Sequence, residues 1–414
     1  MTATPIAPPA VAARAPQMLA LLATALVLAL SVWFSASAVA PELRARWQLT
    51  AAQAGWLTAA VQLGFVAGTL VAAVTNVADM IPSRRYFATC AAGAALATLA
   101  CARAPGFGTA LGARVVAGIF LAGVYPPALK MAATWFFRDR GFATGVVIAA
   151  LTLGKGLPYL LHAFPALTAD LVLRGAAGAA AAGGLLVLLC YEDGPFAFPR
   201  RRFDPALVAR LAAVPEVRRI TLGYLGHMWE LYALWTWLPA WAAASLAGAA
   251  VTTTGAPVPR TPLADLLAML MFVAGAVGCV WGGRRADRIG YLPVARQAMR
   301  GSGACALLSG GAFLLPWWAL APFVAAWGFL VIADSGQFSA ALTRAAPPDA
   351  VGTALTLQTS LGFLLTIVTI QGTGALADTF GWQWALVALA LGPLAGAKAV
   401  GEGSRREGGP ETRG

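Results

Sequence analysis

The sequence predicts an all-α membrane protein whose twelve transmembrane helices form two pseudo-symmetric halves of six helices each. The chain has 414 residues, of which 59% are hydrophobic and only 11% are charged, whereas about 25% of the residues in soluble domains are charged. It contains twelve apolar runs of roughly 20 residues, the length that crosses a bilayer as a helix. Short motifs also recur at a nearly constant offset in the two halves of the chain.

The twelve predicted spans are 17–40, 52–75, 86–103, 109–133, 142–165, 172–190, 219–245, 263–283, 296–315, 318–343, 352–376 and 382–399. The first run is too long for a signal-peptide core, so we predict that it is a retained first helix. Arginines gather in alternate loops, and this positive-inside pattern predicts that both termini are cytoplasmic. The predicted inside loops include Arg84, Arg85, Arg218, Arg219, Arg284, Arg285 and Arg288.

An internal repeat divides the chain. The repeated positions are FVAG at 65–68 and 272–275, the Ala-Asp pairs that end at Asp79 and Asp287, and the Leu-Gly steps that end at Gly154 and Gly362. The last two pairs share an offset of 208 positions. Such repeats in transporters place the binding site near the bilayer midplane, at the interface between the repeats. We predict halves at 1–190 and 219–414, joined by a cytoplasmic linker at 191–218 that carries a short amphipathic helix.

Several function classes are disfavoured. The net charge of +12 comes from arginines between spans, whereas nucleic-acid binding needs a basic surface on a recognition module. The five cysteines are scattered singly without a CxxC pair, so neither a disulfide framework nor a metal site is expected. No phosphate-cradling loop is present, and we therefore expect no cofactor and no ATP-driven transport.

Acidic and basic residues follow spans two and eight in matching positions. The second copy has Gly283, Asp287, Arg288 and Gly290, and the first keeps Asp79, Arg84 and Arg85 but has Thr75, Met80 and Pro82 at the remaining positions. With twelve spans in two halves, this pattern resembles the major facilitator superfamily, whose signature is Gly, three residues, Asp, Arg, any residue and Gly, then Arg or Lys. The resemblance implies conformational switching at the cytoplasmic face. The alternative is a static ion pair that fixes the loop.

Residues 122–136 and 140–158 are similar to bacterial permeases grouped with nitrate, nitrite and cyanate-type porters. The nitrate porters carry an arginine inside spans two and eight, whereas this chain has Gln62 in span two and no charge in either. This difference argues against nitrate as substrate. The glycine-proline signature of drug exporters is interrupted by Lys155 in span five, so drug or metabolite efflux is an alternative. The resemblance implies a multi-pass protein of the bacterial inner membrane, and we expect a monomer.

Span seven contains the polar residues that need an explanation. His227 and Glu230 are three residues apart and share one helix face, with Tyr224 one turn earlier. Polar side chains inside a membrane are costly and mark substrate or proton paths. Glu230 is the main proton-carrier candidate because desolvation favours a neutral carboxyl group, and histidine titrates near neutral pH. Alternatively, Glu230 forms a permanent ion pair with a basic residue.

Asp334 lies inside span ten, with Gln337 three residues later on the same face. It corresponds in the repeat to the Tyr125-Pro126-Pro127 segment of span four, where we predict a bend. The resemblance implies that spans one, four, seven and ten line a central cavity, which would bring Tyr125, His227, Glu230 and Asp334 towards one another. Asp334 is then either a second proton site or a partner of Lys155.

Other polar or aromatic side chains are candidates for the cavity wall. Lys155, near the middle of span five, either neutralises a substrate carboxylate or pairs permanently with Glu230 or Asp334. The remaining candidates are Trp33, Gln62 and Gln358, and each can equally be a packing residue. Arg114 is predicted to snorkel from a span end, and His162 is predicted to lie at the outer membrane interface.

The sequence thus predicts a secondary transporter that moves a small organic solute by alternating access and is coupled to protons. Its expected partners are the solute, protons and the lipid bilayer. The rival from another class is a membrane-embedded enzyme that uses His227, Glu230 and Asp334 as acid-base groups. No GxSxG nucleophile or HExxH pair supports the rival, and we therefore predict that the protein is not an enzyme.

Overall fold

The computed structural model describes residues 9–136, 140–196, 204, 206–248 and 261–401. Every regular element in these residues is a helix. Nine helical segments among them are long and apolar enough to cross a membrane. Together with α1, α12 and α14 they form twelve membrane-crossing rods, and the predicted all-α, twelve-span fold is confirmed.

The first six rods are α1 (Pro9–Leu30) with α2 (Ser35–Ala38), α4 (Ala51–Thr75), α6 (Ser83–Ala102), α7 (Phe107–Leu121) with α8 (Tyr125–Trp135), α9 (Arg140–His162) and α10 (Ala169–Cys190). The second six are α12 (Pro215–Ala247), α13 (Pro262–Ile289), α14 (Tyr291–Ala312), α15 (Trp317–Ile332) with α16 (Ser335–Ala345), α17 (Val351–Phe380), and α18 (Trp382–Ala385) followed by η2 (Val387–Ala390) and α19 (Leu391–Gly401). Short helices α3 (Ala40–Trp47), α5 (Val77–Met80) and α11 (Leu207–Ala213) lie between rods.

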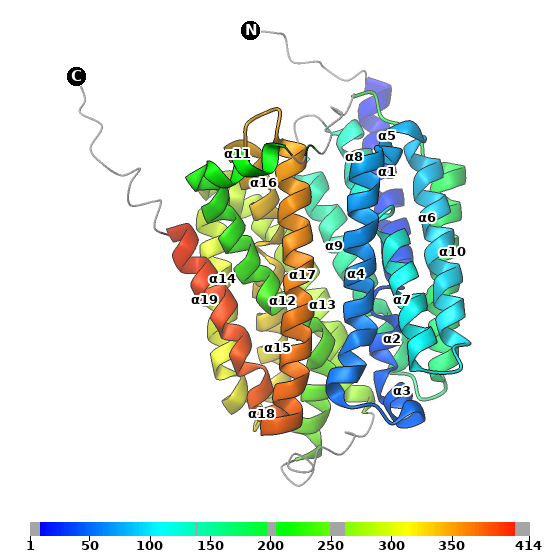
Figure 1. The fold of residues 1–414 in the computed structure, drawn as a ribbon, viewed down its shortest axis with the longest axis vertical. Helices are drawn as coiled ribbons and strands as arrows, with labels where there is room; N and C mark the ends of the chain where they lie inside the picture. Colours follow the sequence, from blue (N-terminus) through cyan, green and yellow to red (C-terminus); the bar gives the residue numbers. More distant parts are fainter. Residues whose placement is uncertain (1–8, 137–139, 197–203, 205, 249–260, 402–414) are drawn as a thin grey trace, which may run out of the picture.

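The rods stand side by side in two groups, with α1 to α10 on the right of Figure 1 and α12 to α19 on the left. The start of α1 and the end of α19 lie towards the same end of the bundle, and α3 and α18 lie at the opposite end. The two groups meet along α4 against α17 and along α9 against α13. The centre of the protein is therefore an interface between the two halves of the sequence.

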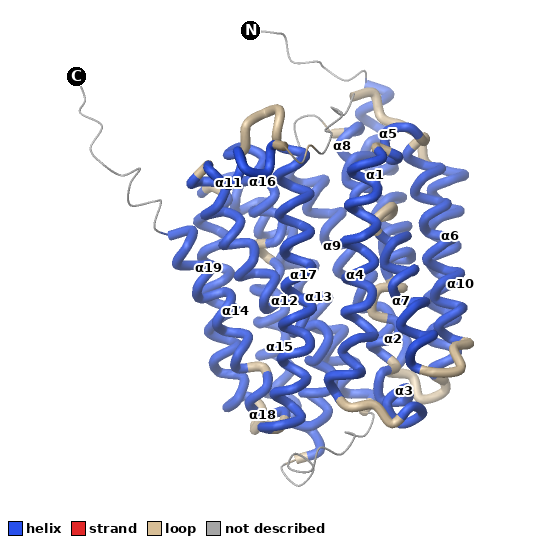
Figure 2. Tube along the Cα trace, viewed as in Figure 1, coloured by secondary structure: helices blue, strands red, loops and turns tan. Residues whose placement is uncertain are grey.

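Three rods are broken part-way along their length, and the breaks are visible as loop segments inside the bundle in Figure 2. The first rod breaks at 31–34, the fourth at 122–124 and the tenth at 333–334. The bend predicted at Tyr125-Pro126-Pro127 is confirmed, because α8 begins at Tyr125. Each proline lacks the backbone N–H that would continue the preceding helix. The equivalent break in the tenth rod places Asp334 immediately before α16.

The repeated glycines lie where helices approach most closely. Gly68 of the first FVAG faces the carbonyl oxygen of Ile119 in α7, and Gly275 of the second faces the carbonyl oxygen of Gly328 in α15. Small residues at helix interfaces allow backbones to pack closely in membranes. The repeat in the sequence therefore corresponds to a repeated helix contact, α4 against α7 in one half and α13 against α15 in the other.

Candidate functional site

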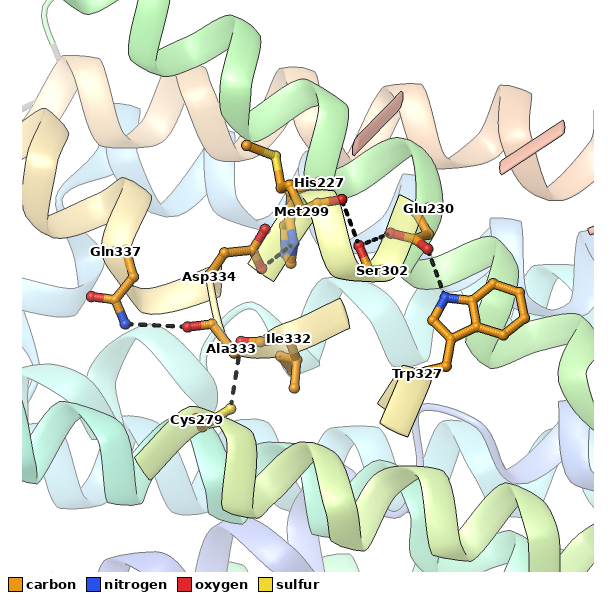
Figure 3. Close-up of polar contacts among 10 residues, drawn as sticks. All are labelled: His227, Glu230, Cys279, Met299, Ser302, Trp327, Ile332, Ala333, Asp334 and Gln337. Atoms are coloured by element: carbon orange, nitrogen blue, oxygen red, sulfur yellow. Dashed lines mark hydrogen bonds and ion pairs between the residues drawn. The ribbon is translucent and has the colours of Figure 1, made fainter. Parts of the chain in front are cut away.

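The polar face of α12 is buried inside the second group of helices. His227 and Glu230 are only 2% and 1% exposed. Both side chains point towards α14 and α15 in Figure 3, where they lie close to Ser302, Trp327 and Asp334. The structure thus brings together three of the four residues that we expected to meet, namely His227, Glu230 and Asp334.

His227 is paired with Asp334 across the break in the tenth rod. Nδ1 of His227 lies 2.8 Å from Oδ1 of Asp334, and both side chains are almost completely buried. The break exposes the carboxylate to α12 because Asp334 stands between the two helix axes of α15 and α16. Nε2 of His227 has no hydrogen-bond partner within the described residues. This buried ring nitrogen is therefore unsatisfied within the described part of the protein.

Glu230 is held by two neutral donors. The Ser302 hydroxyl donates to Oε2 at 2.7 Å, and the Trp327 indole N–H donates to Oε1 at 2.7 Å. The Ser302 hydroxyl also lies 3.3 Å from the carbonyl oxygen of Met299, as Figure 3 shows. Among the described residues no lysine or arginine pairs with Glu230, so the permanent ion pair considered as the alternative is absent there.

Lys155 lies in an aromatic enclosure between the two halves of the bundle. Its Nζ is 4.2 Å from the ring centroid of Trp33, 4.5 Å from that of Tyr232 and 5.0 Å from that of Trp235. Nζ also donates a hydrogen bond to the Tyr232 hydroxyl. No carboxylate among the described residues pairs with Lys155, so of the two alternatives for this residue the permanent pair with Glu230 or Asp334 is not seen there.

The remaining predicted cavity residues lie on the first, second and eleventh rods. Trp33 lies in the break of the first rod and contacts Phe65 and Phe363 with its ring. The side-chain amides of Gln62 and Gln358 are buried, and both polar atoms of Gln62 and Nε2 of Gln358 lack a partner in the described part of the protein. These unsatisfied groups cluster on α4 and α17, the helices that join the two halves.

Tyr224 lies beside His227 as expected, whereas Gln337 and Tyr125 have other neighbours than expected. Tyr224 lies one turn before His227, with the two ring centroids 6.1 Å apart. Gln337 donates to the carbonyl oxygen of Ala333 at 3.3 Å and is turned away from the Asp334 carboxylate in Figure 3. Tyr125, at the start of α8, has no hydrogen bond or ring contact to His227, Glu230 or Asp334 among the described residues.

The second signature copy lies at the end of α13 beside the start of α9. The Asp287 carboxylate is exposed and close to Gly141, since a Cβ built there would be 3.6 Å from Oδ1. Gly283 lies one turn earlier, Arg288 is exposed, and Gly290 caps α13 with a φ of 90°. In the first copy Arg84 and Arg85 are exposed on α6, and the side chain of Asp79 lies outside the described residues.

Two buried polar residues were misjudged from the sequence. Arg114, expected to snorkel, is fully buried and donates to the carbonyl oxygens of Leu57, Val32 and Trp33. Val32 and Trp33 lie in the break of the first rod, and a break of this kind leaves no clear sequence signal. His162, expected at the interface, is 1% exposed and lies between the carboxylates of Glu42 and Asp265.

Comparisons with known proteins agree with this architecture. A bacterial homologue of the human lysosomal transporter Spinster, in an inward-facing and occupied conformation, has a TM-score of 0.71 at 15% sequence identity, covering 94% of this chain and 97% of that one. The human organic anion transporter MFSD10 has a TM-score of 0.69 at 17% identity, covering 95% and 100%. A search of curated protein sequences gave no match.

At these identities the structural matches establish the fold alone. A family model provides the assignment, because the model described as Major Facilitator Superfamily matches residues 21–370. This match spans most of the chain and includes both the aromatic enclosure of Lys155 and the buried acidic cluster. On this basis the chain belongs to the Major Facilitator Superfamily and has the fold of a membrane transporter.

Proposed function

We propose that this protein is a proton-coupled secondary transporter of a small organic anion that works by alternating access between its two halves. Glu230 is the coupling group in this proposal, with His227 and Asp334 as a second protonatable pair. Lys155 and its aromatic neighbours form the solute subsite. The arginine distribution supports an orientation in the bacterial inner membrane with cytoplasmic termini, and we infer a monomer.

The observation that carries this proposal is the neutral surroundings of Glu230. A buried carboxylate that is locked structurally is normally paired with a cation, whereas Glu230 accepts only from Ser302 and Trp327. When Glu230 gains a proton, its new O–H can donate to the Ser302 oxygen, and the Ser302 hydroxyl can turn to the Met299 carbonyl oxygen 3.3 Å away. Both protonation states are therefore hydrogen-bonded, as a proton carrier requires.

The pair of His227 and Asp334 gives protonation a mechanical consequence. Asp334 is located at the junction of α15 and α16, so its contact with α12 holds two independent helix segments together. Loss or gain of a proton by this pair changes the attraction across the junction. Because the tenth rod is already broken there, a change in its bend needs no additional loss of backbone hydrogen bonds.

Lys155 supplies the positive charge for an anionic solute. A buried ammonium group without a carboxylate partner is costly, and three aromatic rings and one hydroxyl offset only part of this cost. A solute carboxylate would complete the site. The organic anion transporter among the structural matches agrees with such a solute.

The experiment combines ligand identification with transport. A panel of small mono- and dicarboxylates is first screened for thermal stabilisation of the purified protein at pH 6 and pH 8, because a ligand of the folded state raises stability by mass action. The stabilising carboxylate is then used in proteoliposomes. Wild type should accumulate it when a pH gradient is imposed, whereas Glu230→Gln should fail to accumulate it and still perform counterflow exchange.

Glu216→Gln is the matched control, because Glu216 lies on the same helix but is partly exposed and pairs with Arg219. It should transport like wild type. Gradient-driven accumulation by Glu230→Gln at the wild-type level would remove Glu230 as the coupling group. Consumption of the carboxylate without vectorial uptake would instead favour the membrane-embedded enzyme.

A further inference from the structure

His162 is enclosed by two carboxylates at the end of the bundle where α3 and α18 lie. It is the last residue of α9, and its side chain is 1% exposed. Nδ1 lies 2.7 Å from Oδ2 of Asp265, and Nε2 lies 2.9 Å from Oε1 of Glu42. Neither the acidic cluster around Glu230 nor the enclosure of Lys155 includes these residues.

The contact joins the two halves of the bundle. His162 and Glu42 belong to α9 and α3 in the first group of helices, whereas Asp265 lies in the first turn of α13 in the second group. The helices are also closely packed at this end. A Cβ on Gly55 of α4 would lie 2.9 Å from the Trp237 ring of α12, and the two halves are therefore closed together around the histidine.

The contacts of His162 indicate how many protons the closed site holds. A carboxylate oxygen accepts hydrogen bonds, so a ring nitrogen facing one must carry a hydrogen. His162 faces a carboxylate with each of its two nitrogens, and this arrangement fits the doubly protonated, positively charged ring. If the ring were neutral, one carboxyl group would have to carry the proton instead. In either case the closed site holds one proton more than a neutral histidine with two ionised carboxylates.

A small cavity of about 60 Å³ adjoins the site and is lined by Arg44, His162, Asp265 and Ala240 among other residues. A cavity of this size accommodates at least one water molecule. Other ionisable groups surround the site. Arg44 contributes a positive charge from α3. Tyr159, one turn before His162 on α9, donates to the carbonyl oxygen of Trp235. Asp378, near the end of α17, accepts a hydrogen bond from the backbone N–H of Ala52.

We propose that His162, Glu42 and Asp265 form a second proton-binding site, a latch that holds the two halves together at this end when it is protonated. Loss of the proton leaves two carboxylates facing a neutral ring. One ring nitrogen then has a lone pair in place of a hydrogen, and this lone pair is repelled by the carboxylate that it faces. The contact between α9 and α13 therefore weakens. Opening at this end is therefore favoured at high pH, and closing is favoured at low pH.

The test measures access to the cavity as a function of pH. Ala240 lines the cavity on α12, and Ala240→Cys introduces a thiol whose maleimide labelling is followed by mass spectrometry in purified, detergent-solubilised protein. The native Cys190 is exposed, so the ratio of the two labelling rates cancels the intrinsic pH dependence of the reagent. The ratio of the rate at position 240 to the rate at Cys190 should rise at least fivefold from pH 5.5 to pH 8.5. In a double variant that also carries His162→Gln, the ratio should not depend on pH.

A second variant protects the test against misfolding of His162→Gln. Glu42 is about one-third exposed, so Glu42→Gln should fold, and loss of one carboxylate should move the labelling midpoint to lower pH by about one unit. A pH-independent ratio in the Ala240→Cys protein, or an unchanged midpoint in Glu42→Gln, would overturn the latch. Glu230→Gln should leave the labelling midpoint unchanged. The test of the latch is therefore independent of the test of coupling through Glu230.

Discussion

His227 and Asp334 join α12 to the break of the tenth rod, with Nδ1 of the histidine 2.8 Å from Oδ1 of the aspartate. The contact is buried on both sides, and it lies where the backbone of the tenth rod has already lost helical continuity. A buried pair at a helix break has two effects. It stabilises one bend of the rod, and its protonation can change that bend.

Asp334→Asn should lower the free energy of unfolding by about 3–5 kcal/mol, because removing one partner of a buried pair leaves the other uncompensated. His227→Gln should have an effect of the same sign. The double variant should lose clearly less than the sum of the two, with a coupling of about 0.5–3 kcal/mol. Chemical denaturation in a mild detergent measures all three, and additive losses would mean that the two residues do not interact.

The hydroxyl of Ser302 should set the pH at which transport is half-maximal. Its hydrogen bond favours the ionised form of Glu230, so Ser302→Ala should let the carboxyl group keep its proton to higher pH. A hydrogen bond to a charged group contributes about 1.5–3 kcal/mol, and the uptake profile should therefore move up by about one pH unit. Trp327→Phe removes the other donor and should move the profile in the same direction. A downward shift in either variant would contradict a carboxyl group that releases its proton during transport.

Lys155 can be tested for solute binding against a purely structural role. Lys155→Met keeps an unbranched apolar side chain but removes the charge, so it should weaken binding of the stabilising carboxylate at least tenfold, or about 1.4 kcal/mol. Thermal stability without solute should be unchanged or raised, because an uncompensated cation is no longer buried. Lys155→Arg should keep more of the affinity. A marked loss of stability in Lys155→Met with unchanged solute binding would identify the lysine as a structural anchor of its aromatic neighbours.

The sequence predicted the rods and the break in the fourth rod because these depend on local features. Apolar length determines a span, and Pro126 and Pro127 interrupt a helix wherever it packs. The offset between repeats aligned Asp334 with this predicted bend, and the structure shows that the tenth rod is broken at 333–334. The partners of Glu230 could not be predicted in this way, since Ser302 and Trp327 lie on two other rods. Serine and tryptophan are ordinary residues in membrane helices, and their pattern carries no signal of this contact.

The errors concern residues near span ends. Arg114 and His162 were placed at the membrane surface because their positions in the sequence are close to the ends of apolar runs. Arg114 is instead held inside by hydrogen bonds to carbonyl oxygens of α4 and of the break in the first rod, and His162 is held by carboxylates from two other elements. These hydrogen-bond and ion-pair partners come together only when the rods are assembled. The position of a charged residue within its span therefore does not predict whether the residue is buried.

The repeated helix contacts make a prediction about packing that is independent of transport. Gly64 of α4 touches the carbonyl oxygen of Val115 in α7 so closely that a Cβ cannot fit there without moving backbone. Gly64→Ala should therefore lower the free energy of unfolding by about 1–3 kcal/mol. Gly112 of α7 has no atom within 4 Å of a built Cβ, so Gly112→Ala should change stability by no more than about 1 kcal/mol, and towards higher stability through helix propensity. Equal effects of the two substitutions in thermal unfolding would mean that α4 and α7 are not in close contact at Gly64.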